Sequence, residues 1–215
     1  MTKLLRFIFF RMIVRFIVLV GLGLNIRRRE LLPKQGPAII VANHNSHLDT
    51  MVLMSLLEPA LLDRVQPVAA MDYFMKNRLL AWFSSNILRI VPLARQFKAH
   101  DNPLKPVHDA LEAGKILILF PEGSRGEPEQ MKAFKKGIAR LAQAHPEVPV
   151  IPVYMHGLGT ALPKGEALFV PFFCDVFVGQ ARYYDNTRND YLQQLQEQMY
   201  QLENEYKAGH AGGVY

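Results

Sequence analysis

The sequence predicts an α/β domain with a mostly parallel central sheet flanked by helices, preceded by an N-terminal membrane-associated helix. Two observations predict the domain: short apolar runs alternate with segments of helical character, and the runs are continuous rather than interrupted by polar residues. Continuous apolar strands are typical of parallel sheets, which are buried on both faces. A third observation, a basic and apolar stretch at the beginning of the chain, predicts the membrane-associated helix.

The chain has 215 residues, half of them hydrophobic, which suits one domain with an appended element. We place that element at residues 1–31 and the domain at residues 32–215. The single cysteine, Cys174, excludes an internal disulfide framework. Because it lies in an apolar run, we expect a buried thiol rather than a nucleophile.

The positive charge is concentrated at the beginning of the chain. Residues 1–30 hold seven basic residues and one acidic residue, which accounts for the whole net charge of +6. A nucleic-acid-binding protein would carry its basic residues on a polar surface. A basic segment that is also apolar and aromatic indicates an anionic membrane surface instead, so membrane lipids are the expected partner and nucleic acid is not.

The first element is a helix predicted over residues 4–24, with apolar residues on one face and Arg11 and Arg15 on the other. Its longest uncharged run, residues 16–26, has eleven residues, whereas a bilayer span needs about 20. A helix lying in the interface on the cytoplasmic face of the inner (plasma) membrane fits this pattern. A tilted span and docking of the helix onto the protein's own core stay open as alternatives. A cleaved signal peptide is disfavoured, because arginines interrupt the apolar region.

The domain begins after a turn-rich boundary at residues 32–36. Apolar runs predict its strands, and apolar residues three or four positions apart predict its helices. The predicted strands cover residues 37–42, 67–70, 87–95, 115–120, 148–154 and 167–178. The predicted helices cover residues 48–58, 75–85, 103–113, 131–144 (after an initial turn) and 185–207.

The turn after the first of these strands, residues 43–49, carries two His, two Asn and one Asp. In α/β folds, chemistry is usually found at the carboxyl ends of strands. His44 can act as a general base near neutral pH, and Asp49 can fix its tautomer and stabilise the imidazolium. The alternative is that Asp49 caps the following helix, because residues 46–49 fit a Ser-x-x-acid pattern. We expect His47 to be a bystander.

Two further strand ends carry groups suited to a phosphate. Arg95 ends the strand predicted at residues 87–95. The strand predicted at residues 115–120 is followed by four candidate substrate-binding residues, Glu122, Gly123, Ser124 and Arg125. Glycine allows close approach of the backbone to a ligand, and arginine binds phosphate with two parallel hydrogen bonds. A solvated arginine and an ordinary Pro-Glu-Gly turn are the structural alternatives. A base, its orienting acid and two arginines at one sheet edge indicate transfer to a hydroxyl of a phosphate-bearing molecule.

Together these segments resemble the glycerolipid acyltransferase family, which includes lysophosphatidic acid acyltransferase. That family has a His-x4-Asp block, a later strand ending in Arg, a Phe-Pro-Glu-Gly-Thr-Arg block and a strand with a characteristic Pro. The corresponding segments here occur in the same order, at residues 44–49, Arg95, residues 120–125 and Pro152. Residues 134–137 resemble the segment that follows the third block, and the resemblance covers residues 32–159.

The resemblance implies an O-acyltransferase in which His44 takes the proton of an acceptor hydroxyl and Asp49 orients His44. The hydroxyl oxygen would attack the thioester of acyl-CoA or acyl carrier protein directly. These thioesters are donor substrates, and neither a cofactor nor a metal is expected. The residues of the second and third blocks would hold the acceptor's phosphate and glycerol: Arg95, Glu122, Gly123, Ser124 and Arg125.

The default acceptor that the resemblance implies is 1-acyl-glycerol-3-phosphate, which would give phosphatidic acid. Ser124 replaces the usual Thr and keeps the hydroxyl, whereas Arg89 stands where the second block often has Gly. Another lysolipid, such as a lyso-ornithine lipid, therefore stays open as the acceptor. A thioesterase or hydrolase would use water instead of the acceptor and would leave the arginines idle. A non-enzymatic membrane-binding protein would need only residues 1–30.

Overall fold

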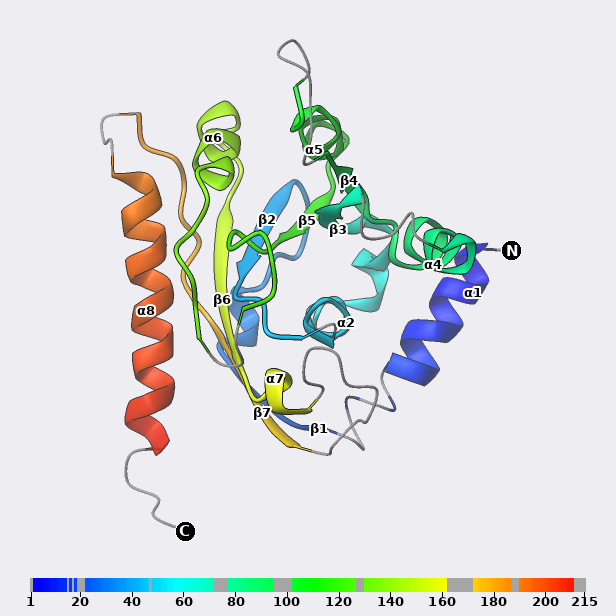
Figure 1. Ribbon diagram of the computed structural model, residues 1–215, viewed down its shortest axis with the longest axis horizontal. Coiled ribbons are helices and arrows are strands. Elements are labelled where there is room, and N and C mark those ends of the chain that lie inside the picture. The colour runs from blue at the N-terminus through cyan, green and yellow to red at the C-terminus, as the bar shows by residue number, and fades with distance from the viewer. Residues whose placement is uncertain are drawn as a thin grey trace.

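The computed structural model of this chain describes residues 2–14, 16, 18, 22–46, 48–71, 77–94, 102–126, 130–161, 172–186 and 190–210 (Figure 1). The strands are β1 (Leu22–Arg27), β2 (Ala38–Ala42), β3 (Val65–Ala70), β4 (Val91–Leu93), β5 (Ile116–Leu119), β6 (Val150–His156) and β7 (Phe172–Val178). The α-helices are α1 (Thr2–Ile8), α2 (Leu48–Leu56), α4 (Arg78–Phe83), α5 (Lys105–Glu112), α6 (Gly137–Ala144), α7 (Leu158–Ala161) and α8 (Tyr191–His210). Short 3-10 or π-helical segments are η1 (Phe9–Val14), η3 (Arg29–Leu31), η4 (Pro59–Arg64) and η5 (Ser84–Leu88).

Within the described residues, the strands form one sheet in the order β1-β7-β6-β2-β5-β3-β4. Every neighbouring pair is parallel except β6 and β7. The predicted α/β fold with a mostly parallel sheet is therefore confirmed.

The central strands are buried on both faces, and their side chains alternate between two cores, as the period of a strand requires. In β2, Ile39 and Val41 pack with α5, α6 and α8, whereas Ile40 and Ala42 pack with α2 and η1. Figure 1 shows the sheet between α8 on one side and α2, α1 and α4 on the other. Cys174 in β7 is a buried free thiol, as predicted.

The parallel pairing brings two of the predicted strand ends together. β2 and β5 are neighbours, paired from Ala38 with Ile116 to Val41 with Leu119. The segments that leave these strands meet directly, since the N–H of Gly126 donates to the carbonyl of His44 at 3.3 Å. The third predicted strand end, Arg95, lies outside the described residues.

The helix predicted over residues 4–24 was too long. Regular α-helix ends at Ile8, η1 continues to Val14, and residues 22–27 form strand β1 instead. β1 pairs with β7, beginning with Leu22 opposite Phe172. The local spacing of apolar residues predicted a helix, because pairing with a strand so far along the chain does not affect the local sequence pattern.

Other boundaries also moved. The helix predicted over residues 75–85 begins at Arg78 and continues as the π-helix η5, so the strand predicted at 87–95 is reduced to β4. The final helix was predicted over residues 185–207, but α8 begins at Tyr191 and ends at His210.

The N-terminal segment docks on the domain with one side. Arg6 is 1 % exposed, and its Nη2 donates to the carbonyls of Leu62 and Val65 at 2.8 and 3.0 Å. Phe10 and Val14 join the core. Docking, one of the alternatives from the sequence, is thus observed, while membrane association stays a prediction. No helix among the described residues is both long and apolar enough to cross a bilayer.

Candidate active site

The turn between β2 and α2 brings His44 and Asp49 into direct contact. The Nδ1 of His44 lies 2.9 Å from Oδ2 of Asp49. The Asp49 side chain is fully buried, whereas 20 % of the His44 side chain is exposed. The carboxylate therefore lies behind the imidazole, and the imidazole faces outward. With Nδ1 turned to Asp49, Nε2 is the nitrogen that can meet a substrate proton.

Asp49 also organises the backbone of the turn. Its Oδ2 accepts the N–H groups of Asn45 at 2.7 Å and Ser46 at 2.9 Å. The bond from Ser46 is the backbone half of a capping box at the start of α2. The two interpretations of Asp49 from the sequence, orienting acid and helix cap, are thus both present in one oxygen atom.

Burial raises the pKa of the Asp49 carboxyl from its usual value. The hydrogen bond and charge of His44 and the backbone N–H groups act in the opposite direction. His44 holds its place through this buried acid, because a carboxylate removed from water is strongly attracted to a donor.

Phe120 fixes the plane of the His44 imidazole ring. Its ring stacks on the ring of His44, with centroids 4.0 Å apart and planes inclined by 18°. Phe120 follows β5, so the neighbouring strand supplies a flat support for one face of the imidazole. Sequence reasoning included Phe120 in a motif but assigned it no role, because the contact exists only once β2 and β5 are paired.

Asn43 joins the ends of two strands. Its side-chain amide donates to the carbonyl of Met155 and accepts the N–H of Met155, each at 2.8 Å. Asn45 donates to the same carbonyl at 3.2 Å. Both asparagines are buried. The turn that carries His44 is therefore clamped to the end of β6, a role that the sequence did not reveal.

Glu122, predicted to bind substrate, lies against the backbone of the site. Its Oε1 accepts the N–H of His44 at 3.0 Å, and its Oε2 accepts the N–H of Lys132 at 3.2 Å. Burial raises the pKa of Glu122, and these backbone hydrogen bonds oppose the rise. The structure thus gives Glu122 a positioning contact, and its contact with an acceptor stays a prediction.

The other predicted substrate-binding residues surround the same turn. Gly123 has φ +75°, and a side chain there would collide with the ammonium group of Lys135. Ser124 is exposed and Arg125 is half-buried. In the part of the chain that the structure describes, no hydrogen bond or ion pair engages the guanidinium of Arg125. Lys135, which sequence reasoning did not select, adds a second cation beside this turn.

The arrangement can perform general base catalysis on a hydroxyl next to two cations. His44, Asp49 and Glu122 are brought together, with Gly123 to Arg125 beside them. Arg95 and His47 lie outside the described residues. Among the described residues, no group of three or more His, Cys, Asp or Glu side chains could hold a metal ion.

Comparisons with known proteins agree on one family. The sequence profile of the Acyltransferase family matches residues 23–156, more than half of the chain. A chloroplastic 1-acyl-sn-glycerol-3-phosphate acyltransferase of Arabidopsis thaliana is 31 % identical over 144 residues, which is 66 % of this chain and 38 % of that protein. The 1-acyl-sn-glycerol-3-phosphate acyltransferase alpha of Mus musculus is 28 % identical over 74 % of this chain and 55 % of its own length.

The fold is similar to that of a solved structure. The 1-acyl-sn-glycerophosphate (LPA) acyltransferase PlsC of Thermotoga maritima superposes with a TM-score of 0.73 at 22 % identity, over 97 % of this chain and 84 % of that one. The two curated relatives are longer proteins, and this chain spans 38 % and 55 % of their lengths. The likeness to the solved structure concerns the fold.

Proposed function

This chain belongs to the acyltransferase family, and from that premise we propose that it transfers a fatty acyl group from a thioester donor to the free hydroxyl of a lysophospholipid. The proposed acceptor is 1-acyl-glycerol-3-phosphate, the substrate in the names of the relatives. The observation that carries the proposal is the 2.9 Å contact between the Nδ1 of His44 and the buried carboxylate of Asp49. Acyl-CoA and acyl carrier protein both fit the role of donor.

The proposed mechanism needs no acyl-enzyme. The Nε2 of His44 takes the proton of the acceptor hydroxyl while the oxygen forms a bond to the thioester carbon. The carbonyl π electrons move onto its oxygen, and the tetrahedral intermediate then breaks its C–S bond. His44 returns the proton to the departing thiolate, so an ester and a thiol result. Asp49 accepts the Nδ1–H throughout and stabilises the transient imidazolium.

The cations beside Gly123 support an acceptor that carries a phosphate. Arg125 is half-buried and is held by no side chain in the described part of the chain. Guanidinium binds phosphate with two parallel hydrogen bonds, and the Lys135 ammonium adds a point charge beside the glycine. We assign Arg125 and Lys135 to the acceptor phosphate, with Ser124 and Gly123 next to it. For Arg95 the same role stays a prediction.

The acyl chain has a suitable place on the other side of α2. A pocket of about 570 Å³ lies between the N-terminal segment, β1 and α2, and its lining is mostly apolar. Met54 and Leu56 line it from α2, five and seven residues after Asp49. At a rise of about 1.5 Å per residue, the pocket begins roughly 8 Å along the helix from the site. We propose that α2 separates the reacting thioester from the tail of its acyl chain.

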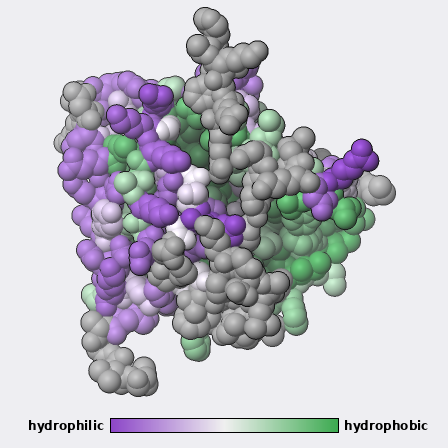
Figure 2. All heavy atoms as spheres, viewed as in Figure 1, coloured by the Kyte–Doolittle hydropathy of each residue, from purple (hydrophilic) through white to green (hydrophobic). Residues whose placement is uncertain are grey.

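Membrane lipids are the proposed partner of an exposed apolar face. This apolar face comprises Leu4, Leu5, Phe7, Ile8, Met12, Ile13 and Phe16 of the N-terminal segment and Leu79, Leu80 and Trp82 of α4. Figure 2 shows it as a continuous green region over α1 and α4. Exposed apolar patches of this kind mark protein or membrane contacts. Association with the cytoplasmic face of the membrane stays a prediction from the charge pattern.

Acyl transfer from a long-chain acyl-CoA to a panel of lysolipids tests the function. We expect the wild-type protein to acylate 1-acyl-glycerol-3-phosphate and His44→Ala to lose at least about a hundredfold in kcat, because a general base supplies about 10²–10⁴. His210→Ala removes an exposed histidine of α8 and serves as the matched control.

Each outcome of that panel has a distinct meaning. Transfer to a different lysolipid would keep the mechanism and replace the acceptor. Release of free fatty acid at the same rate with and without any lysolipid would support a thioesterase. Undiminished transfer by His44→Ala would contradict the proposed base.

A further inference from the structure

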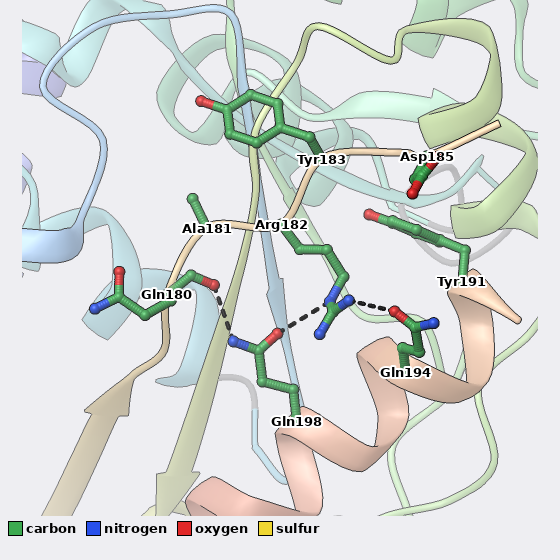
Figure 3. Close-up of a pocket in the computed structure, with 8 residues that line it drawn as sticks. All are labelled: Gln180, Ala181, Arg182, Tyr183, Asp185, Tyr191, Gln194 and Gln198. Atoms are coloured by element: carbon green, nitrogen blue, oxygen red, sulfur yellow. Dashed lines mark hydrogen bonds between the residues drawn. The ribbon is translucent and has the colours of Figure 1, made fainter. Parts of the chain in front are cut away.

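A second pocket lies near the beginning of β6, at the opposite end of the strands from His44. It has a volume of about 370 Å³ and is lined by the segment after β7 and by the first turns of α8 (Figure 3). Arg182 of this segment exchanges two backbone hydrogen bonds with Val150, the first residue of β6, at 2.8 and 2.9 Å. Val150 also pairs with Ile39, five residues before His44 along β2. At about 3.3 Å per residue the two sites are roughly 16 Å apart, so this pocket is separate from the candidate active site.

Arg182 is held in the pocket by neutral partners. Its Nη1 donates to Oε1 of Gln194 at 2.5 Å, and its Nε donates to Oε1 of Gln198 at 3.3 Å. The two amides are themselves oriented, since Gln198 donates to the carbonyl of Gln180 and Gln194 donates to Asp190. Gln194 and Gln198 are uncharged, and among the described residues no carboxylate forms an ion pair with the Arg182 guanidinium.

Tyr191 adds a buried donor without a partner. The residue is 5 % exposed, and its hydroxyl makes no hydrogen bond within the described part of the chain. Burial raises the pKa of Tyr191 well above its usual value, so the hydroxyl stays a neutral donor. Figure 3 shows its ring reaching from the start of α8 toward the segment that carries Arg182. An unpaired buried hydroxyl is destabilising, and an acceptor on a ligand would remove that penalty.

We propose that this pocket binds the oxyanion group, phosphate or carboxylate, of a small soluble molecule. The Arg182 guanidinium supplies the charge, the Tyr191 hydroxyl supplies a directed donor, and the N-terminus of the 20-residue helix α8 adds a favourable dipole. Asp185 also lines the pocket and can accept a hydroxyl of the same ligand.

The size and position of the pocket favour a soluble ligand over a lipid head group. A volume of about 370 Å³ is near the lower end for small-molecule sites. The pocket lies beside α8, whereas the apolar face lies over α1 and α4 on the other side of the sheet (Figure 1).

Thermal unfolding with inorganic phosphate and with acetate, at constant ionic strength in chloride, tests the proposal. The background is the full chain with Arg125→Gln and Lys135→Gln, which removes the two cations assigned to the acceptor phosphate at the active site. We expect a saturable rise in Tm with at least one anion, since a ligand that binds only the folded state stabilises it. The tighter anion identifies phosphate or carboxylate as the natural group.

Two variants locate the effect. Adding Arg182→Gln should abolish the rise, and adding Tyr191→Phe should weaken the anion about tenfold, the loss of one hydrogen bond. Arg78→Gln, an exposed arginine on α4, is the matched control and should leave the rise intact. Neither Arg182→Gln nor Tyr191→Phe should change kcat for acyl transfer in the chain with Arg125 and Lys135 intact.

Three results would overturn the proposal. The first is no rise in Tm with either anion, and the second is an equal rise when Arg182→Gln is added. The third is an unchanged affinity in Tyr191→Phe together with lower stability in the absence of anion, which would assign the hydroxyl to a bound water. Tyr191→Phe keeps the test decisive if Arg182→Gln does not fold.

Discussion

The two carboxylate oxygens of Asp49 accept different numbers of hydrogen bonds. Oδ2 accepts three hydrogen bonds, from the N–H groups of Asn45 and Ser46 and from His44. Oδ1 is buried and accepts none within the described residues. Because one oxygen serves both the turn and the imidazole, the position of His44 is coupled to the start of α2. A substitution at Asp49 therefore isolates its effect on His44 only if the substitution preserves the backbone conformation of the turn.

Asp49→Asn is the substitution that preserves the turn. The amide oxygen can take the place of Oδ2 and still accept the two backbone N–H groups and the Nδ1–H of His44, but it carries no charge to stabilise the imidazolium. We expect kcat for acyl transfer to fall about 10²–10⁴-fold with KM little changed. Asp109→Asn, on the surface of α5, is the control and should keep full activity. A loss of less than threefold in Asp49→Asn would show that His44 needs no charged partner.

The stability of Asp49→Asn should also depend on pH differently from that of the wild-type protein. Burial raises the pKa of Asp49, so the folded protein holds this proton more tightly than the unfolded chain does. Stability from this group is therefore present below the ordinary carboxyl pKa of about 4 and is lost as the pH rises to the raised pKa. We expect urea unfolding from pH 4 to 7 to show wild type losing stability relative to Asp49→Asn. Parallel curves for the two proteins would contradict the raised pKa.

Much of the candidate site was visible in the sequence as residue types and spacing. His44 and Asp49 stood out because a base and an acid occur together after an apolar strand. The contacts of Phe120 and Asn43 did not, because each reaches a strand that only the folded sheet places alongside β2. Glu122 was found, but its observed partners are backbone N–H groups of His44 and Lys132, which no sequence pattern announces.

At the scale of elements, α2 connects the two halves of the proposed reaction. Its first turn holds Asp49, and its last residues line the apolar pocket assigned to the acyl chain. Ser55 of α2 also lines this pocket, and its hydroxyl donates back to the carbonyl of Val52 rather than to another element. A larger side chain at Ser55 can therefore fill the pocket without breaking a tertiary hydrogen bond.

Ser55→Phe should change the preference for acyl-chain length. The added ring would displace the distal methylene groups of a long chain, and two of them are worth about 1.6 kcal/mol, or roughly tenfold. We expect kcat/KM for a sixteen-carbon acyl-CoA to fall about tenfold relative to a ten-carbon one. Ser85→Phe, an exposed serine on η5, is the control and should leave the ratio unchanged. An equal loss for both chain lengths would remove the acyl chain from this pocket.

The elements that the sequence predicted well are those defined by local pattern. The continuous run at residues 148–154 predicted β6 to within two residues at each end, because a strand buried on both faces needs apolar residues throughout. β1 was missed because Leu22–Arg27 is apolar at only some positions and owes its form to pairing with β7. Its partner lies so far along the chain that only the assembled sheet identifies it.

At the scale of the whole molecule, more than half of the basic residues of the N-terminal segment contact the domain. Arg6 donates to two carbonyls of the domain, Arg28 to Val178 and Glu205, and Arg29 to the carbonyl of Leu56. Arg27 lies over the ring of Phe177. Four of the seven basic residues thus hold the segment to the domain. If all seven basic residues bound anionic lipid, at about 1 kcal/mol each, electrostatic attraction would dominate membrane binding. Because four of them are engaged within the protein, we expect the apolar face to dominate instead.

Vesicle binding distinguishes apolar from electrostatic attachment. Trp82 on α4 is 47 % exposed, and burying it in the interface is worth about 2 kcal/mol. We expect Trp82→Glu to weaken binding to phosphatidylcholine vesicles more than tenfold in a sedimentation assay. The matched control is Tyr200→Glu, a partly exposed aromatic residue on α8 across the sheet from α4, and it should bind like wild type.

The lipid composition supplies the second arm of that experiment. Because several arginines are engaged within the protein, adding anionic lipid should raise binding only about tenfold or less, and salt should reverse that gain. A protein that ignores phosphatidylcholine vesicles, binds anionic vesicles and tolerates Trp82→Glu would contradict the apolar face as the membrane contact. Deletion of residues 1–30 cannot replace these point changes, since it would remove the edge strand β1 from the sheet together with the segment. Trp82→Glu on α4 leaves the sheet intact, so a loss of binding in this variant would report on the membrane contact itself.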